Sequence, residues 1–206
     1  MHELTDERPS QAAVHAADGA LMQAVVRGDR VAFARIHADH RARLFRLAYG
    51  VLLDREEARE AVQEAFLQLH ANASRWEPAA AIGTWLYRVV LNHCLSLRRR
   101  LLRFGRGDKP KGTGPSPELA AVLGEAVGIV ERSLAELPPR QRAVLTLHLD
   151  GELSPSEIAP LVDLTPNATR VALHRALGRL RENLTAAGID ATPARDDPPF
   201  EPLEET

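Results

Sequence analysis

The sequence has little cysteine and few aromatic residues. Among its 206 residues there is a single cysteine, Cys94, and aromatic side chains make up 4%. One cysteine excludes an internal disulfide and a cysteine cluster with metal-ligand spacing. His37 and His40 lie one helical turn apart, but no third ligand accompanies them in the sequence. We therefore expect no metal site and no cofactor, and the lone thiol indicates a reducing compartment.

Long hydrophobic runs are also missing. No uncharged apolar segment approaches the ~20 residues that a transmembrane helix needs. The first residues, MHELTDERPSQ, are polar and acidic, whereas a signal peptide is basic and then apolar. We predict a cytoplasmic protein that does not insert into a membrane.

Neither sign of charge dominates the whole chain, which has 26 Lys and Arg against 28 Asp and Glu and a net charge of −2. The charges are nevertheless segregated. Residues 98–111 hold seven basic side chains and one acidic one, whereas residues 196–206 hold five acidic side chains and no basic one. The basic stretch favours a polyanion or an anionic surface as a partner.

The segment RFGRGDKPKGTGPSP, at residues 103–117, divides the chain. Glycine, proline and charged residues make it a linker, and helical periodicity continues on both sides without a convincing strand pattern. We predict an all-α protein of two small helical domains, at residues 20–103 and 118–188, joined by a flexible basic linker at 104–117. We expect mobile tails at 1–19 and at the acidic segment 189–206.

The first domain contains a predicted acidic helix. Asp54 is a favourable N-cap residue, and Glu57 follows at the spacing of a capping box. One face of this helix is apolar, while the opposite face carries Glu57, Glu60 and Glu64. From periodicity alone, a solvated helix surface explains this acidic face better than a binding site does.

A second helix, predicted from Ile82 to about Leu102, ends in the basic stretch. Its polar side presents Arg88 and Asn92, and three consecutive arginines follow at 98–100. These exceed what a helix C-terminus requires and favour phosphate binding. Trp76 and Trp85 flank the preceding Ala-rich loop, where indoles either anchor the core or wall a pocket for an unstacked base.

The second domain has three helix start signals. Pro138-Pro139 precedes a helix at 140–149, a capping box spans residues 154–157, and Thr165-Pro166 begins a helix that ends near Leu184. The short middle helix and long final helix predict a helix-turn-helix of the winged-helix-like class. The outward residues of the final helix can contact base edges and phosphates; they are Asn167, Arg170, His174, Arg175, Arg179 and Arg181.

Two blocks of sequence resemble a known family. They are EEAREAVQEAFLQLHANASRW with GTWLYRVVLNHCLSLRRR, and LAELPPRQRAVLTLHLDGELSPSEIA with NATRVALHRALGRLRENL. A helix-turn-helix alone is a weak signal, but both blocks in this order, separated by a basic linker, are specific. Over residues 29–184 the chain resembles bacterial extracytoplasmic-function (ECF) sigma factors of the sigma-70 family, which retain only sigma regions 2 and 4.

The resemblance implies a promoter-specificity subunit that binds core RNA polymerase, melts promoter DNA and directs transcription of a stress or envelope-type regulon. Such a subunit is not an enzyme, takes no small-molecule substrate and has no catalytic residue. The residues implied to bind core polymerase are Glu57, Glu60, Gln63 and Glu64. Those implied to bind the minus-ten element are Trp76, Trp85, Arg88, Asn92, Arg98, Arg99 and Arg100. Those implied to bind the minus-thirty-five element are Asn167, Arg170, His174, Arg175 and Arg179. An anti-sigma factor is a further implied partner.

Several residues depart from the family pattern. Arg59 stands where an acid is common and should weaken the negative potential of its helix, and Ser96 stands where Asp is usual. Glu152 separates Gly151 from the following Leu-Ser step, and Ala168-Thr169 replaces the usual Thr-Val pair. Pro160 falls within the first helix of the helix-turn-helix and should end that helix early.

Two other functions remain alternatives. A freestanding helix-turn-helix regulator would need a dimerisation element to read paired half-sites, and we find none in the sequence. A sigma-like interaction protein that titrates an anti-sigma factor would keep its protein-binding surfaces and lose its DNA-facing residues. The presence of Arg88, Asn92 and Arg170 argues against that loss.

Overall fold

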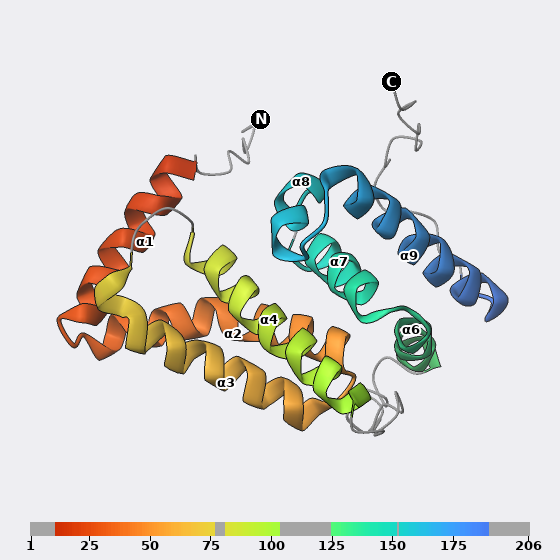
Figure 1. Ribbon diagram of the computed structural model, residues 1–206, viewed down its shortest axis with the longest axis horizontal. Helices are drawn as coiled ribbons and strands as arrows, with labels where there is room; N and C mark the ends of the chain where they lie inside the picture. Colours follow the sequence, from red (N-terminus) through yellow and green to blue (C-terminus); the bar gives the residue numbers. More distant parts are fainter. Residues whose placement is uncertain (1–10, 77–80, 104–124, 152, 190–206) are drawn as a thin grey trace, which may run out of the picture.

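The structure is a computed structural model that describes residues 11–76, 81–103, 125–151 and 153–189 (Figure 1). These residues form helices and contain no strand. They make an N-terminal unit, helices α1–α4, and a C-terminal unit, helices α6–α9, which pack together along α2 and α7. The fold is therefore all-α, as the sequence predicts. The predicted linker at 104–117 lies outside the described residues.

The N-terminal unit consists of α1 (Gln11–Val26), α2 (Arg30–Leu52), α3 (Arg55–Asn72), the 3-10 turn η1 (Ala73–Arg75) and α4 (Ile82–Arg103). Helix α2 packs against both α3 and α4 around buried apolar side chains such as Leu47, Phe66 and Leu86. The predicted N-cap is confirmed, because Asp54 accepts hydrogen bonds from the backbone N–H groups of Glu56 and Glu57 at 3.0 and 3.1 Å.

The first helix begins earlier than the predicted start of the first domain at residue 20. The predicted mobile tail at 1–19 overlaps helix α1, which begins at Gln11, while residues 1–10 lie outside the described residues. Met22 and Val25 are buried, and the Asp18 carboxylate accepts a hydrogen bond from the backbone N–H of Ile82 at 2.7 Å. Alanines separate the few large apolar residues of α1, so its periodicity is a weak signal.

The C-terminal unit consists of α6 (Glu125–Glu136), α7 (Pro139–Leu149), α8 (Pro155–Ile158), the 3-10 turn η2 (Ala159–Leu161) and α9 (Pro166–Ala186). Ser154 and Glu157 form the predicted capping box, and the Thr165 side chain accepts a hydrogen bond from the N–H of Ala168 at 3.2 Å. Helix α8 ends at Ile158, and a 3-10 turn containing Pro160 follows it. This early end agrees with the prediction, because proline has no backbone N–H to donate to an α-helical hydrogen bond. Helices α8 and α9 thus form the helix-turn-helix.

Candidate functional site

Helix α3 presents a mixed exposed face and not a uniformly acidic one. Glu60 and Gln63 are exposed, whereas Glu57 and Glu64 are half-buried. Glu64 accepts a hydrogen bond from Gln68 at 2.9 Å, on the side of α3 that faces α4. Leu67, one turn beyond Gln63, is 57% exposed. The centre of this face is therefore formed by Glu60, Gln63 and Leu67. Of the four residues predicted to bind core polymerase, Glu60 and Gln63 lie at this centre, whereas Glu57 and Glu64 lie at one edge.

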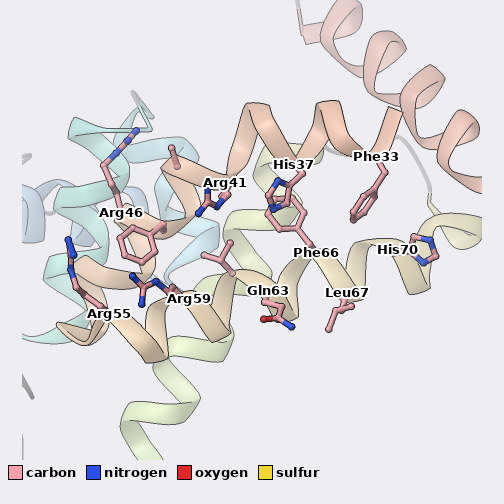
Figure 2. Close-up of a pocket in the computed structure, with 13 residues that line it drawn as sticks. Phe33, His37, Arg41, Arg46, Arg55, Arg59, Gln63, Phe66, Leu67 and His70 are labelled. Carbon is pink, nitrogen blue, oxygen red and sulfur yellow. The ribbon is translucent and has the colours of Figure 1, made fainter. Parts of the chain in front are cut away.

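A groove of about 900 Å³ runs between α2 and α3, and Gln63 and Leu67 of that face form part of its lining (Figure 2). Its apolar surface includes Phe33, Phe45 and Phe66, and the His37 ring lies 4.5 Å from the Phe66 ring between centroids. Four arginines also line it: Arg41, Arg46, Arg55 and Arg59. Arg59 pairs with Glu56 in the preceding turn. A basic, apolar groove therefore borders the exposed face of α3 on the side opposite its acidic edge. No local pattern in the sequence predicts this groove.

A second cleft, of about 410 Å³, lies between α3 and α4. It brings together two of the predicted minus-ten residues, Asn92 and Arg100, and adds Gln68, His93 and Ser96. Arg88 and Arg99 are exposed on α4 outside this cleft, and the Arg99 Nε donates a hydrogen bond to the Leu95 carbonyl at 3.4 Å. The cleft thus combines amide, imidazole, hydroxyl and guanidinium groups that can hydrogen-bond bases and phosphate.

Arg98 does not share the exposed position of its neighbours. It is 7% exposed, and burial lowers the pKa of its guanidinium. Successive residues of a helix point in different directions, so Arg98 follows the buried Leu91 and Cys94 at helical spacing while Arg99 and Arg100 turn outward. Of the three consecutive arginines, only Arg99 and Arg100 are therefore exposed to solvent.

The two tryptophans pack against each other edge to face, with ring centroids 6.2 Å apart at 75°. Both are half-buried at the base of α4. Trp76 also lines a cleft of about 330 Å³ with Met22 and Val26 of α1, and its buried Nε1–H has no hydrogen-bond partner among the described residues. The indoles are therefore core anchors, and Trp76 in addition faces an open cleft. Residues 77–80 between them lie outside the described residues.

On α9 the predicted minus-thirty-five residues fall into two groups. Asn167, Arg170, His174 and Arg175 are exposed in its N-terminal half. Arg179 instead donates to the Glu136 carboxylate of α6 at 3.1 Å, and Asn183 donates to the same carboxylate at 3.3 Å. Arg179 therefore lies at the α6–α9 contact. Thr169 is fully buried, so of the Ala168-Thr169 pair the threonine belongs to the core.

The fold and these surfaces define a two-unit helical DNA-binding protein whose second unit is a helix-turn-helix. Residues 36–104 match the family model described as Sigma-70 region 2, and residues 127–180 match Sigma-70, region 4. The chain is 31% identical over 169 residues to the ECF RNA polymerase sigma factor SigM of Mycobacterium tuberculosis (strain ATCC 25618 / H37Rv), covering 79% of this chain and 82% of that protein. It is 27% identical over 173 residues to the ECF RNA polymerase sigma factor SigW of Bacillus subtilis (strain 168), covering 78% and 92%.

The chain belongs to the ECF sigma factors of the sigma-70 family and directs transcription initiation. Its fold is also that of two solved structures. CnrH in complex with the cytosolic domain of CnrY matches with a TM-score of 0.63 and 24% identity, over 82% of this chain and 98% of that chain. RpoE in complex with the anti-sigma factor NepR from Bartonella quintana matches with a TM-score of 0.55 and 19% identity, over 69% and 89%.

Two classes of site are not found in the part of the chain that the structure describes. Within residues 11–76, 81–103, 125–151 and 153–189, no three His, Cys, Asp or Glu side chains gather as a metal site would need. None of the described helices combines the length and the hydropathy needed to cross a bilayer.

Proposed function

We propose that this sigma factor binds core RNA polymerase through the face of α3 centred on Glu60, Gln63 and Leu67. The observation that carries the proposal is Leu67, a large apolar side chain that is 57% exposed where the polar face of α3 meets the apolar groove. A large exposed apolar residue bordered by polar ones is typical of the centre of a protein interface. Glu57 and Glu64 lie at the edge of this contact and contribute negative charge.

The N-terminal unit, within residues 20–103, is also assigned the minus-ten element. The cleft between α3 and α4 would hold the opened strand, with Arg100 on phosphate and Asn92 on a base edge. Trp76 and Trp85 would support the preceding loop, where one base is unstacked. Preferential binding to the open strand would melt the duplex without a nucleotide cofactor, so we assign no catalytic role. We also propose a cytoplasmic site of action, because the proposed partners are core RNA polymerase and promoter DNA.

The C-terminal unit, within residues 118–188, is assigned the minus-thirty-five element. The exposed N-terminal half of α9 would enter the major groove and read it through Asn167, Arg170, His174 and Arg175. Arg179 would act indirectly, by holding α9 against α6 through Glu136. Reading two elements from separate units would make their spacing part of the specificity.

An anti-sigma factor is proposed as a further partner. The two solved structures of this fold are, by their titles, CnrH in complex with the cytosolic domain of CnrY and the sigma factor RpoE in complex with the anti-sigma factor NepR. The groove between α2 and α3 has an apolar floor and four arginines along it. It would suit an acidic amphipathic helix, whose apolar stripe covers the floor while its carboxylates pair with the arginines.

Polymerase binding is tested by titrating the labelled full-length protein into bacterial core RNA polymerase. The variant Glu60→Lys with Glu64→Lys should bind at least tenfold more weakly, whereas Asp39→Lys with Glu182→Lys, an equal change of charge elsewhere, should not. Leu67→Asp is matched by Val31→Asp, because Val31 is another exposed apolar residue of the unit, at 78%. Equal losses in both members of either pair would contradict the assigned face.

Failure of the unmodified protein to bind core polymerase would favour the alternative functions. A protein that binds an anti-sigma factor but not polymerase would be a titrating sigma mimic. A protein that binds promoter DNA tightly without polymerase would be a freestanding regulator, and its DNA-bound form would be a dimer.

A further inference from the structure

Helix α9 carries a line of residues along one exposed side, which we call the α9 stripe. Its members follow one another at intervals of three or four residues and therefore lie above each other on the helix; they are Arg170, His174, Gly178 and Arg181. Arg170 and Arg181 are exposed, and neither forms an ion pair with any carboxylate of the described residues. The stripe therefore presents positive charge that the described part of the chain does not pair.

A glycine lies in the middle of the α9 stripe. Gly178 is inside the helix and has no left-handed backbone, although glycine there costs about 1 kcal/mol relative to alanine. A Cβ atom at this position would meet nothing within 4 Å among the described residues. Glycine is the residue that permits another segment to approach a backbone closely. The stripe thus combines positive charge with room for a close contact at its centre.

The chain turns back where α9 ends. Gly188 has a left-handed φ of 76°, and its N–H donates to the Thr185 carbonyl at 2.9 Å. The N–H of Ile189 donates to the Leu184 carbonyl at 3.0 Å. These two hydrogen bonds and the left-handed glycine form a Schellman motif. Ile189 therefore lies beside the last turn of α9, and the following residues start from the side of the helix.

The segment that follows this turn is acidic. Residues 190–206 lie outside the described residues, and their sequence is DATPARDDPPFEPLEET. It contains six acidic residues and four prolines, against one basic residue, Arg195. Proline disfavours helix and favours the extended polyproline conformation. The segment therefore supplies carboxylates, in a chain that favours extension, next to the helix whose arginines lack them.

The spacing of charges in the two segments agrees. A helix rises about 1.5 Å per residue, so Arg170 lies about 27 Å from Gly188 along α9. An extended polyproline chain advances about 3.1 Å per residue, so residues 196–197 lie about 25–28 Å from the same glycine. On the same scale the small residues at 191–194 come level with the two turns around Gly178. Two adjacent aspartates thus meet Arg170, and small side chains cross the glycine.

We propose that the acidic segment 190–206 lies back along the α9 stripe, with Asp196 and Asp197 against Arg170, and competes with promoter DNA for this surface. The competition rests on the proposed function, which assigns Arg170 to the minus-thirty-five element. Exposed ion pairs are individually weak, but a tethered segment has a high effective concentration at its own helix. The free subunit would then bind DNA weakly, and DNA held by the polymerase complex would displace the segment.

The contact is tested with a spin label on Ala194→Cys in the full-length chain. Cys94 should remain unlabelled, since it is buried and burial raises the pKa of its thiol to about 12. The label should broaden the backbone NMR signals of Arg175 and its neighbours on α9. An unmodified segment that leaves these signals sharp would overturn the proposal.

A matched pair of variants separates specific contact from general attraction. Asp196→Lys with Asp197→Lys should abolish the broadening, because this pair lies level with Arg170. Glu204→Lys with Glu205→Lys makes the same change of charge beyond the start of α9 and should retain it. Adding Arg170→Glu to the first variant should restore the broadening by reversing both partners. Equal broadening in the two lysine variants would overturn the assigned register.

The crossing point is tested at Gly178. Gly178→Leu places a branched side chain where the segment should pass and should remove the broadening at Arg175. Leucine favours the helix, so α9 should keep its helical content by circular dichroism. Ala186→Leu, at an exposed position of α9 outside the stripe, is the control and should keep the broadening. Broadening that survives Gly178→Leu, or is lost equally in both variants, would overturn the proposed path.

Competition is measured by the fluorescence anisotropy of a short labelled DNA duplex of arbitrary sequence at low salt. Asp196→Lys with Asp197→Lys should bind about fivefold more tightly than Glu204→Lys with Glu205→Lys, because only the first change frees Arg170 for phosphate. Equal affinities would overturn the competition. A DNA affinity that Arg170→Ala leaves unchanged would overturn the assignment of α9 to DNA, and the spin label would still report the contact within the chain.

Discussion

The Asp18 carboxylate of α1 accepts a hydrogen bond at 2.7 Å from the backbone N–H of Ile82, the first residue of α4. The two residues are 64 positions apart in the chain. Asp18 therefore acts as an N-cap supplied from another helix, and its negative charge complements the positive end of the α4 dipole. Because α4 carries Asn92 and Arg100, helix α1 helps to position the proposed minus-ten cleft.

Asp18→Ala should lower the free energy of unfolding by about 1 kcal/mol, the usual cost of losing a helix cap. Asp18→Asn should retain most of the stability, since asparagine is also a good cap. Asp39→Ala is the control, because Asp39 is exposed and its ion pair with Arg35, at 3.9 Å, contributes little. Urea denaturation of the three variants measures these differences, and equal losses for Asp18→Ala and Asp39→Ala would contradict the capping role.

Local signals were enough to predict most of the fold. The caps at Asp54, Ser154 and Thr165 depend on residues within three positions, and the structure confirms each of them. Asp18 caps a helix 64 residues away, and Arg142 reaches a carbonyl 91 residues away. Such contacts depend on how helices pack in three dimensions, so periodicity and capping patterns contain no signal for them.

Arg142 is buried and donates to the carbonyls of Val51 and Leu134, in the last turns of α2 and α6, at 2.8 and 3.2 Å. Arg142→Met should lower the free energy of unfolding by about 2 kcal/mol. Methionine fills a similar volume but leaves the Val51 and Leu134 carbonyls without their charged donor, and hydrogen bonds to charged groups contribute about 1.5–3 kcal/mol. Arg140→Met, an exposed arginine of the same helix, should change stability by less than about 0.5 kcal/mol. Thermal or urea unfolding measures the difference in free energy of unfolding between the two variants. A loss for Arg142→Met as small as that for Arg140→Met would contradict the capping of two helix ends.

Alkaline pH should weaken the protein through Cys94. Burial raises the pKa of this thiol from its ordinary value of 9.0 to about 12, so the unfolded chain loses the proton first as pH rises. Stability from this group is therefore complete below pH 9 and falls as pH rises from 9 toward 12. Between pH 9 and pH 10 the unmodified protein should lose about 1 kcal/mol more than Cys94→Ala does. Parallel urea denaturation curves for both proteins would contradict this assignment.

The candidate site was less predictable than the fold. The sequence shows three consecutive arginines as one cluster, but the structure buries Arg98 and exposes Arg99 and Arg100. The exposure of Leu67 was not predicted, because residue type alone does not distinguish an exposed leucine of an amphipathic helix from a buried one. Its spacing from Gln63, on the polar face, is the signal that could have identified it.

Asn92 and Arg100 share one cleft but should have different effects on DNA binding by the holoenzyme. Arg100→Ala should weaken binding for every sequence and reduce the slope of log affinity against log salt by about 0.7, as expected for one lost phosphate contact on a single strand. Asn92→Ala should relax the preference at one base position by about 1–3 kcal/mol and leave the salt slope unchanged. Binding to promoters selected from a random-sequence pool, at several salt concentrations, measures both.

Arg35→Ala is the control for this pair, since Arg35 is exposed on α2 and lines neither the groove nor the cleft. A salt slope lowered equally by Arg35→Ala and Arg100→Ala would place the phosphate contact elsewhere. A preference unchanged in Asn92→Ala would show that the cleft does not read the base edge through this amide.

Arg170 and Arg179 lie on the same helix but should contribute differently to recognition of the minus-thirty-five element. Arg170 is exposed in the N-terminal half of α9, so Arg170→Ala should lose about 1–3 kcal/mol of discrimination at one base pair. Arg179 pairs with Glu136 on α6, so Arg179→Ala should leave base preference unchanged and lower stability by less than about 1 kcal/mol. Selection from promoters randomised in this element measures the preference, and urea denaturation measures the stability. A changed preference in Arg179→Ala would show that this side chain leaves Glu136 and contacts a base.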